Sequence, residues 1–195
     1  MIIGGLHTQN GEKRGDASYY FSRYPHIWGW ASWRRAWAKY DVQAAQLPEF
    51  RRQKQIHNIF DNPAEQEFWM KNFESVYENK VDTWDYQWVF TIFANNGMCI
   101  LPNVNLVSNI GFGADATHTH DPNALDANHP TEDIGKLSHP QFMLVNKEAD
   151  TFESQHVFHI SPATMVPAGD STYRKLVKKI PQGLKDTVKK AVGKS

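Results

Sequence analysis

The distribution of tryptophan constrains this chain more than any other feature, because four of its seven tryptophans lie within ten residues, from Trp28 to Trp37. Trp30, Trp33, Trp37 and Tyr40 follow one another at intervals of three, four and three residues, the spacing of one face of a helix. A helical stripe of large aromatic side chains is typical of a core. We therefore expect Trp33 and Trp37 to be buried.

The turn that precedes this stripe has a different character. Gly29 stands between Trp28 and Trp30, and glycine permits a tight backbone that displays the two neighbouring rings. A second aromatic cluster, TWDYQW, contains Trp84 and begins at residue 83. Flat rings stack on sugar faces while polar groups bind the hydroxyls, so these four residues are predicted to contact a carbohydrate.

Asp85 is the carboxylate inside the second cluster. Partial desolvation by the surrounding rings raises the proton affinity of a carboxylate, which suits a general base that deprotonates a sugar hydroxyl. The alternative is an ordinary acid at a helix N-terminus, stabilised by the helix dipole. Asp82 lies three residues earlier and is predicted to be a helix cap.

A third segment, NIGFGADATHTH, combines glycines with histidine and aspartate. Gly111 and Gly113 would let such a loop close over a ligand, and we expect both glycines and Phe112 to contact substrate. His118, together with Asp115, is a candidate for binding a metal or a diphosphate. The alternative is that these are solvent-exposed loop side chains, because the spacing is not a specific metal signature.

Composition places the chain among globular proteins, with 195 residues, 41% hydrophobic and 22% charged, and excludes wholesale disorder. The net charge of zero is unevenly distributed, because residues 174–195 carry eight Lys or Arg and one acid. We expect a domain over 1–160 and a basic amphipathic tail over 161–195. The tail is predicted to bind an anionic membrane surface, the alternative being a solvated terminus.

Cys99 is the only cysteine, which fits a reducing compartment and excludes a disulfide within the chain. The N-terminus is too short and uncharged for a signal peptide, and the sequence lacks the roughly 20-residue apolar run that spans a bilayer. The predicted location is therefore cytoplasmic, at the inner face of the membrane if the tail binds there. We expect no nucleic-acid partner.

Periodicity and capping signals predict the order of elements. Helices are expected over 30–40, 48–60, 63–78 and 84–95, the third with Asn62 as N-cap and Pro63 in the first position. Strands are expected over 1–6, 18–21, 98–101, 104–108 and within 141–160, and residues 111–140 are expected to form a long loop. The pattern predicts an α/β fold.

The order of four blocks resembles the C-terminal half of bacterial glycosyltransferases. The blocks are IGG at 3–5, YFSRYPHIWGWASWRRAW at 20–37, TWDYQW at 83–88 and PNVNLVSNIGFGADATHT at 102–119. They resemble the family-2-like nucleotide-diphospho-sugar transferases of GT-A fold, also labelled haemolytic-protein-like. The resemblance covers about residues 1–160, and a looser one extends to Golgi N-acetylglucosaminyltransferases.

The resemblance implies the C-terminal part of a GT-A fold, a mixed sheet with flanking helices. It implies an inverting transfer in which Asp85 takes a proton from the acceptor hydroxyl while that oxygen attacks the anomeric carbon of a nucleotide-sugar donor. A divalent metal, Mg or Mn, would neutralise the leaving diphosphate, with His118 touching either one. The acceptor would be a saccharide or a lipid-linked molecule in surface polysaccharide or glycoconjugate synthesis.

One departure from the family pattern separates two hypotheses. The family's N-terminal half binds the nucleotide and ends in an Asp-x-Asp motif, and this sequence contains no Asp-x-Asp. We therefore expect the chain to be a fragment without its nucleotide-binding half and inactive in isolation. The rival is a non-catalytic carbohydrate- or membrane-binding remnant. A metal-dependent hydrolase using Asp85, His118 and His120 has less support, because no ligand spacing favours it.

Overall fold

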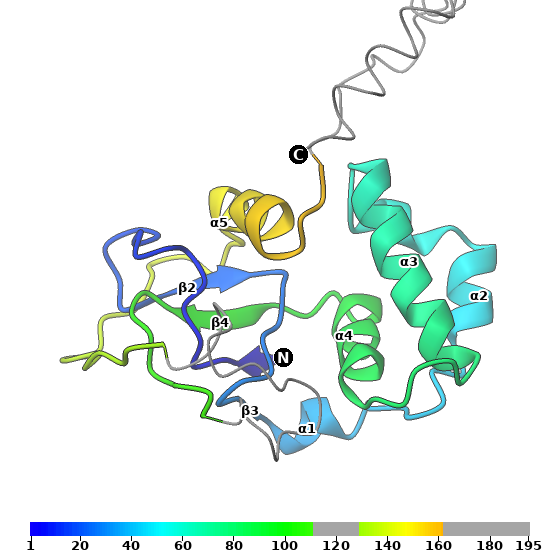
Figure 1. Ribbon diagram of the computed structural model, residues 1–195, viewed down its shortest axis with the longest axis horizontal. Coiled ribbons are helices and arrows are strands. Elements are labelled where there is room, and N and C mark those ends of the chain that lie inside the picture. Colours follow the sequence, from blue (N-terminus) through cyan, green and yellow to red (C-terminus); the bar gives the residue numbers. More distant parts are fainter. Residues whose placement is uncertain (111–128, 162–195) are drawn as a thin grey trace, which may run out of the picture. The chain divides into compact units, whose positions relative to one another are not determined.

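A mixed four-stranded sheet forms one side of the fold in the computed structural model, which describes residues 1–110 and 129–161 (Figure 1). The strand order is β2-β4-β1-β3, and the strands are β1 (Ile2–Ile3), β2 (Tyr19–Ser22), β3 (Ala31–Ser32) and β4 (Cys99–Pro102). β1 pairs parallel with β4, with Ile2 opposite Cys99, while β2 and β3 pair antiparallel with their neighbours. The predicted α/β class is confirmed at this level.

The chain between β3 and β4 is helical and lies at one end of the sheet (Figure 1). It contains α1 (Arg34–Trp37), α2 (Leu47–Arg52), the 3₁₀ turn η1 (Gln55–Asn58), α3 (Pro63–Tyr77) and α4 (Asp85–Ala94). After β4, α5 (Lys147–Phe152) continues into the π-helical turn η2 (Glu153–Val157). Ala149 of α5 packs with Tyr20 and Leu101, so α5 covers the sheet face to which these side chains point.

The two longest helices begin and end where their sequence signals predict. The Asn62 side chain accepts a hydrogen bond from the Ala64 backbone N–H at the start of α3. Asn96 follows α4 with φ of 48°, and the next backbone N–H, of Gly97, donates to the Ile92 carbonyl at 2.8 Å. This is the hydrogen-bond pattern of a Schellman cap.

Aromatic side chains from these helices fill the main core. Trp69, Phe73, Trp88 and Ile92 are at most 2% exposed, and they pack with Ile2 and Cys99 of the sheet. The Trp69 ring contacts that of Phe93 edge-on, with centroids 5.1 Å apart. The core therefore joins α3 and α4 to the end of the sheet.

The predicted helix over 30–40 is wrong in extent, because only Arg34–Trp37 are helical. Gly29 has φ of 56°, and Ala31–Ser32 pair with β1 instead. The rings nevertheless gather: Trp30 stacks on Trp84 with centroids 5.4 Å apart, and Trp37 stacks on Tyr40 at 4.5 Å. The predicted burial of Trp33 and Trp37 is wrong, since their exposed fractions are 36% and 41%.

Two of the predicted strands are also wrong. Residues 104–108 form no strand; there the Asn105 side chain bonds the backbone of His7 and Pro130 in two other segments and of Val107 in its own. Residues 147–157 are helical rather than extended. There the Asn146 side chain caps α5 by accepting from the Ala149 backbone N–H at 2.9 Å. Within residues 1–110 and 129–161, no helix is long and apolar enough to cross a bilayer.

Candidate functional site

A pocket of about 180 Å³ lies where the turn after β2 meets the first residues of α4. It brings Asp85 and Trp28 together, which are 57 positions apart in the sequence. The other lining residues come from the same turn, from α3 and α4, and from the N-terminal and C-terminal segments: Leu6, Pro25, His26, Ile27, Trp69, Tyr86, Val89 and Phe158. Pockets for drug-sized ligands start at about 300 Å³, so this pocket has room for about one sugar ring.

Asp85 is the first residue of α4, where the helix dipole favours a negative charge. Its Oδ1 accepts hydrogen bonds from the Thr83 hydroxyl and, at 2.8 Å, from the Tyr86 backbone N–H. Gln87 donates to the Thr83 carbonyl at 2.7 Å and so holds the turn that precedes the helix. The hydrogen bonds from Thr83 and Tyr86 hold the carboxylate at the pocket. Both are accepted by the same oxygen, Oδ1.

Trp28 and Tyr86 are half-buried and line the pocket together with the aromatic rings of Trp69 and Phe158. Burial, followed by the nearby charge of Asp85, raises the pKa of Tyr86. The phenol therefore stays neutral at ordinary pH and offers both a ring face and a hydroxyl. An indole, a phenol and a carboxylate are the side chains expected for binding a sugar ring.

Gly29 makes the turn beside Trp28 possible for two reasons. Its φ of 56° lies in the left-handed region, and a Cβ at this position would stand 2.1 Å from Cγ1 of Val107. Trp30 and Trp84 lie outside the pocket lining, stacked on each other. Their predicted contact with substrate stays a prediction.

The remaining predicted site residues, Gly111, Phe112, Gly113 and His118, lie outside the described residues. Among the residues that the structure does describe, no three His, Cys, Asp or Glu side chains are grouped as a metal site would require. The predicted metal contact of His118 therefore stays a prediction.

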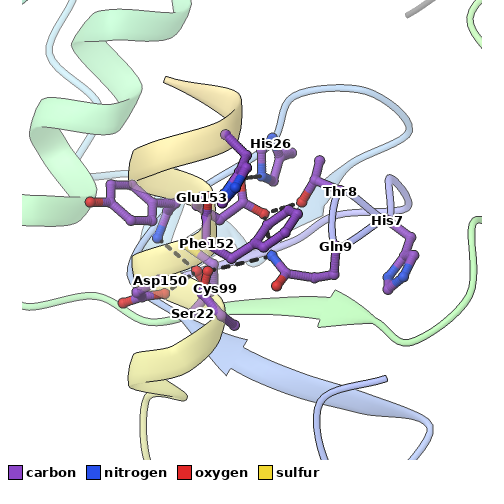
Figure 2. A network of polar contacts seen from close by, with 12 residues as sticks. His7, Thr8, Gln9, Ser22, His26, Cys99, Asp150, Phe152 and Glu153 are labelled. Carbon is purple, nitrogen blue, oxygen red and sulfur yellow. Dashed lines mark hydrogen bonds and ion pairs between the residues drawn. The ribbon is translucent and has the colours of Figure 1, made fainter. Parts of the chain in front are cut away.

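A polar network behind the pocket, shown in Figure 2, has no counterpart in the sequence analysis. Glu153 is fully buried, and its Oε1 accepts hydrogen bonds from the Thr8 hydroxyl and, at 2.8 Å, from Gln9 Nε2. Its Oε2 lies 3.2 Å from His26 Nε2, an ion-pair contact without hydrogen-bond geometry. Arg14 extends the network by donating to Gln9 Oε1 at 2.7 Å.

Burial acts to raise the pKa of the Glu153 carboxyl, but the contacts with His26, Thr8 and Gln9 outweigh it and hold this pKa below its usual value. Glu153 is therefore a carboxylate inside the protein. Asp150, one turn earlier, accepts from the Ser22 hydroxyl at 2.7 Å and from the Arg23 backbone N–H. Burial raises the pKa of Asp150 to about 6 despite these bonds.

The only sequence signal for this network was the Asn-Lys-Glu-Ala-Asp start of a capped helix at 146–150, which places Asp150 and Glu153 one helical turn apart. His26 gave no signal of its own, since it meets Glu153 across 127 positions of sequence. Comparison of the chain with protein-family models, with curated proteins and with solved structures finds no match.

Proposed function

We propose that this chain is the acceptor-side part of an inverting, GT-A-like glycosyltransferase that uses a nucleotide-sugar donor. One observation carries the proposal: the carboxylate of Asp85 and the indole of Trp28 line a single pocket sized for one sugar ring. The mixed sheet with helices is compatible with this assignment. The reaction type comes from the sequence resemblance, two of whose blocks contain Trp28 and Asp85.

In the proposed reaction the acceptor sugar lies against Trp28 and Tyr86 with one hydroxyl directed at Asp85. The carboxylate takes the hydroxyl proton as the oxygen forms a bond to the anomeric carbon of the donor. The bond from that carbon to the diphosphate breaks, and the electron pair leaves with the diphosphate. Asp85 is suited to this step because its backbone and Thr83 contacts hold it at the pocket before substrate arrives.

A divalent metal at the diphosphate, contacted by His118, remains part of the proposal. Among residues 1–110 and 129–161, no three His, Cys, Asp or Glu side chains are grouped so as to hold it, and the proton transfer to Asp85 does not require it. The donor, the saccharide or lipid-linked acceptor, and the role in surface polysaccharide or glycoconjugate synthesis rest on the resemblance.

A non-catalytic carbohydrate-binding remnant is the second candidate, and one observation favours it. Trp33, Trp37 and Trp84 are each 36% to 41% exposed. Several large aromatic side chains exposed on one protein are a feature of surfaces that bind a ligand or partner. Such a protein would bind sugar through the same rings without transferring it. Sugar binding without turnover when the nucleotide-binding half is present would select this candidate.

The first prediction concerns Asp85→Asn. General-base catalysis contributes about 10²- to 10⁴-fold, so this variant of the active transferase should lose at least about 100-fold in turnover while donor binding is nearly unchanged. The assay measures release of nucleoside diphosphate from a panel of UDP-, GDP- and TDP-sugars in the presence of saccharide acceptors. Isothermal titration with the accepted donor measures binding.

Asp82→Asn is the matched control, because Asp82 is exposed and lies three residues from Asp85. It removes the same charge near the helix start and should leave turnover within a factor of two or so. If Asp85→Asn turns over within tenfold of the wild type, Asp85 is not the general base. If the transferase with its nucleotide-binding half in place binds sugars but releases no nucleoside diphosphate from any donor, the non-catalytic candidate is correct.

A further inference from the structure

A group of aromatic rings lies beside the Asp85 pocket and outside its lining. We call it the aromatic platform, and it consists of Trp30, Trp37, Tyr40 and Trp84. The Trp30 ring contacts two partners, since it is stacked on Trp84 with centroids 5.4 Å apart and tilted against Trp37 at 5.7 Å. Trp37 stacks in turn on Tyr40 at 4.5 Å. The mechanism proposed above uses none of these four side chains.

Two features hold the platform in place. The first is Trp88 of the main core, which has no exposed surface. Its ring contacts those of Trp30, Trp37 and Tyr40 at centroid distances of 6.3, 5.0 and 6.2 Å. The second is the hydrogen bond that the Tyr40 hydroxyl donates to the Trp84 carbonyl at 3.1 Å. Side chains that are already fixed lose little conformational freedom when a ligand binds, so the platform is prepared for binding.

The platform and the pocket are built from the same two segments of the chain. Trp28 of the pocket and Trp30 of the platform are two positions apart in the turn after β2. Trp84 of the platform directly precedes Asp85 at the start of α4. Two residues of extended chain span at most about 7 Å, so the backbones that carry the two surfaces are close at both places. The platform therefore borders the pocket.

Trp84 is the platform residue that a ligand can cover most readily. Trp30 occupies one face of its ring, yet 41% of the residue is exposed. A flat ring with one face covered exposes its edges and its other face, and such an apolar face packs against the C–H face of a sugar. The pocket, at about 180 Å³, has room for about one sugar ring. A second sugar of the same ligand must lie outside it, and the platform is an adjoining surface.

We propose that Trp84 forms a second acceptor subsite, in which the sugar next to the one in the Asp85 pocket stacks on the indole. This inference rests on the proposed function and specifies its acceptor as a saccharide of at least two rings. Stacking of the second ring would supply binding energy away from the reacting hydroxyl. That energy can be used to hold the hydroxyl against the Asp85 carboxylate.

The experiment measures binding of the full chain to matched sugars by NMR, which requires no turnover. The pairs are glucose with cellobiose, mannose with mannobiose, and N-acetylglucosamine with chitobiose. The indole N–H signal of Trp28 reports on the pocket and that of Trp84 on the platform, assigned by their loss in Trp28→Phe and Trp84→Phe. In at least one pair the monosaccharide should shift Trp28, whereas the disaccharide should shift both signals and bind about tenfold more tightly.

Trp84→Ala should remove the advantage of the disaccharide and leave monosaccharide binding within about twofold of wild type. Trp84→Phe keeps a ring and should retain most of the advantage. Trp84 is not one of the residues that form the main core, so the melting temperature of Trp84→Ala should lie within about 3 °C of wild type. Tyr77→Ala is the matched control, because Tyr77 is 42% exposed at the end of α3, and this variant should bind both sugars like the wild type.

Disaccharides that bind no more tightly than their monosaccharides, or an advantage that survives in Trp84→Ala, overturn the subsite while the pocket remains a sugar site. A wild-type dimer in analytical ultracentrifugation that Trp84→Ala converts to a monomer also overturns it, because the platform would then join two copies of the chain. If none of these sugars shifts Trp28 in the wild type, the proposed function itself fails and this inference with it.

Discussion

At the scale of single residues, Asp150 gives the structure its clearest dependence on pH. Burial raises its pKa to about 6, above the usual value of 3.8, although Ser22 and Arg23 donate hydrogen bonds to the charged form. The folded state therefore binds this proton more tightly than the unfolded state does. The resulting stabilisation is fully present below about pH 4 and is lost as the pH rises through about 6.

Asp150→Asn should remove this dependence, because the amide does not titrate. Between pH 4 and 7 the free energy of unfolding of the variant should rise relative to wild type, by at most about 3 kcal/mol. Urea unfolding at pH 4, 5, 6 and 7 measures the difference. Glu148→Gln, at an exposed position of the same helix, is the control for a change of charge alone. A difference between Asp150→Asn and wild type that stays constant across this range contradicts the assignment.

At the scale of elements, the turn from Trp28 to Trp30 packs against the segment that contains Val107. Gly29 and Gly5 both face this valine, and a Cβ on either would stand within 2.6 Å of Val107 Cγ1. The chain at Gly5 and the turn at Gly29 thus lie closer to the side chain of Val107 than a residue with a Cβ would permit. The position of Trp28 depends on that approach.

Gly29→Ala and Gly11→Ala form a matched pair that measures the approach. Both glycines have positive φ, but a Cβ at Gly11 would have nothing within 4 Å. Gly11→Ala should lower the free energy of unfolding by about 1–2 kcal/mol from backbone strain alone. Gly29→Ala should lower it by about 3 kcal/mol or more, because overlap with Val107 adds to the strain. Equal losses in chemical unfolding would show that Val107 moves away freely.

The elements that the sequence predicts well are those with both a period and a cap. α3 has Asn62 and Pro63 at its start, and α4 ends before Asn95-Asn96-Gly97, so both were located to within a residue or two. Strands β2 and β4 follow short apolar runs and were predicted as well. The segment 141–160 was predicted as a strand from weak alternation, yet Asn146 is a helix cap whose signal was stronger.

The tryptophan stripe shows why periodicity alone was insufficient. Its spacing fits a helix, but Gly29 adopts a left-handed conformation and Ala31–Ser32 bond to β1, so a helix cannot start before residue 33. The candidate site was half predictable. Asp85 and Trp28 were identified by residue type, whereas His26 and Glu153 required knowledge of which distant segments meet. No local pattern encodes a contact across 127 positions.

At the scale of the whole molecule, contacts between distant parts of the chain hold the site together. β1 pairs with β4 from opposite ends of the helical region, and Gln9 bonds Glu153 across 144 positions. Charge is also distributed on this scale, since residues 174–195 carry eight of the 21 basic side chains. This tail lies outside the described residues, and its binding to anionic lipid stays a prediction: a basic segment gains about 1 kcal/mol for each Lys or Arg near an anionic surface.

Removal of residues 171–195 should therefore release the protein from anionic liposomes. Co-sedimentation with vesicles of mixed phosphatidylserine and phosphatidylcholine measures the bound fraction of both chains. The full chain should bind these vesicles at low salt and should not bind vesicles of pure phosphatidylcholine. At 0.5 M salt it should bind less, because screening shortens the range of the electrostatic attraction. Equal sedimentation of the full and shortened chains would refute a membrane role for the tail.

The rate at which the single cysteine, Cys99, reacts with a reagent can measure how fast the central sheet opens. Cys99 has no exposed surface and lies on β4 between two other strands, and burial raises the pKa of its thiol far above the usual range. A disulfide reagent can thus reach the sulfur only in molecules whose sheet has separated. The labelling rate should rise with reagent concentration and then level off at the opening rate of the sheet. A native preparation labelled as fast as a urea-unfolded one would mean that β4 is not shielded in solution.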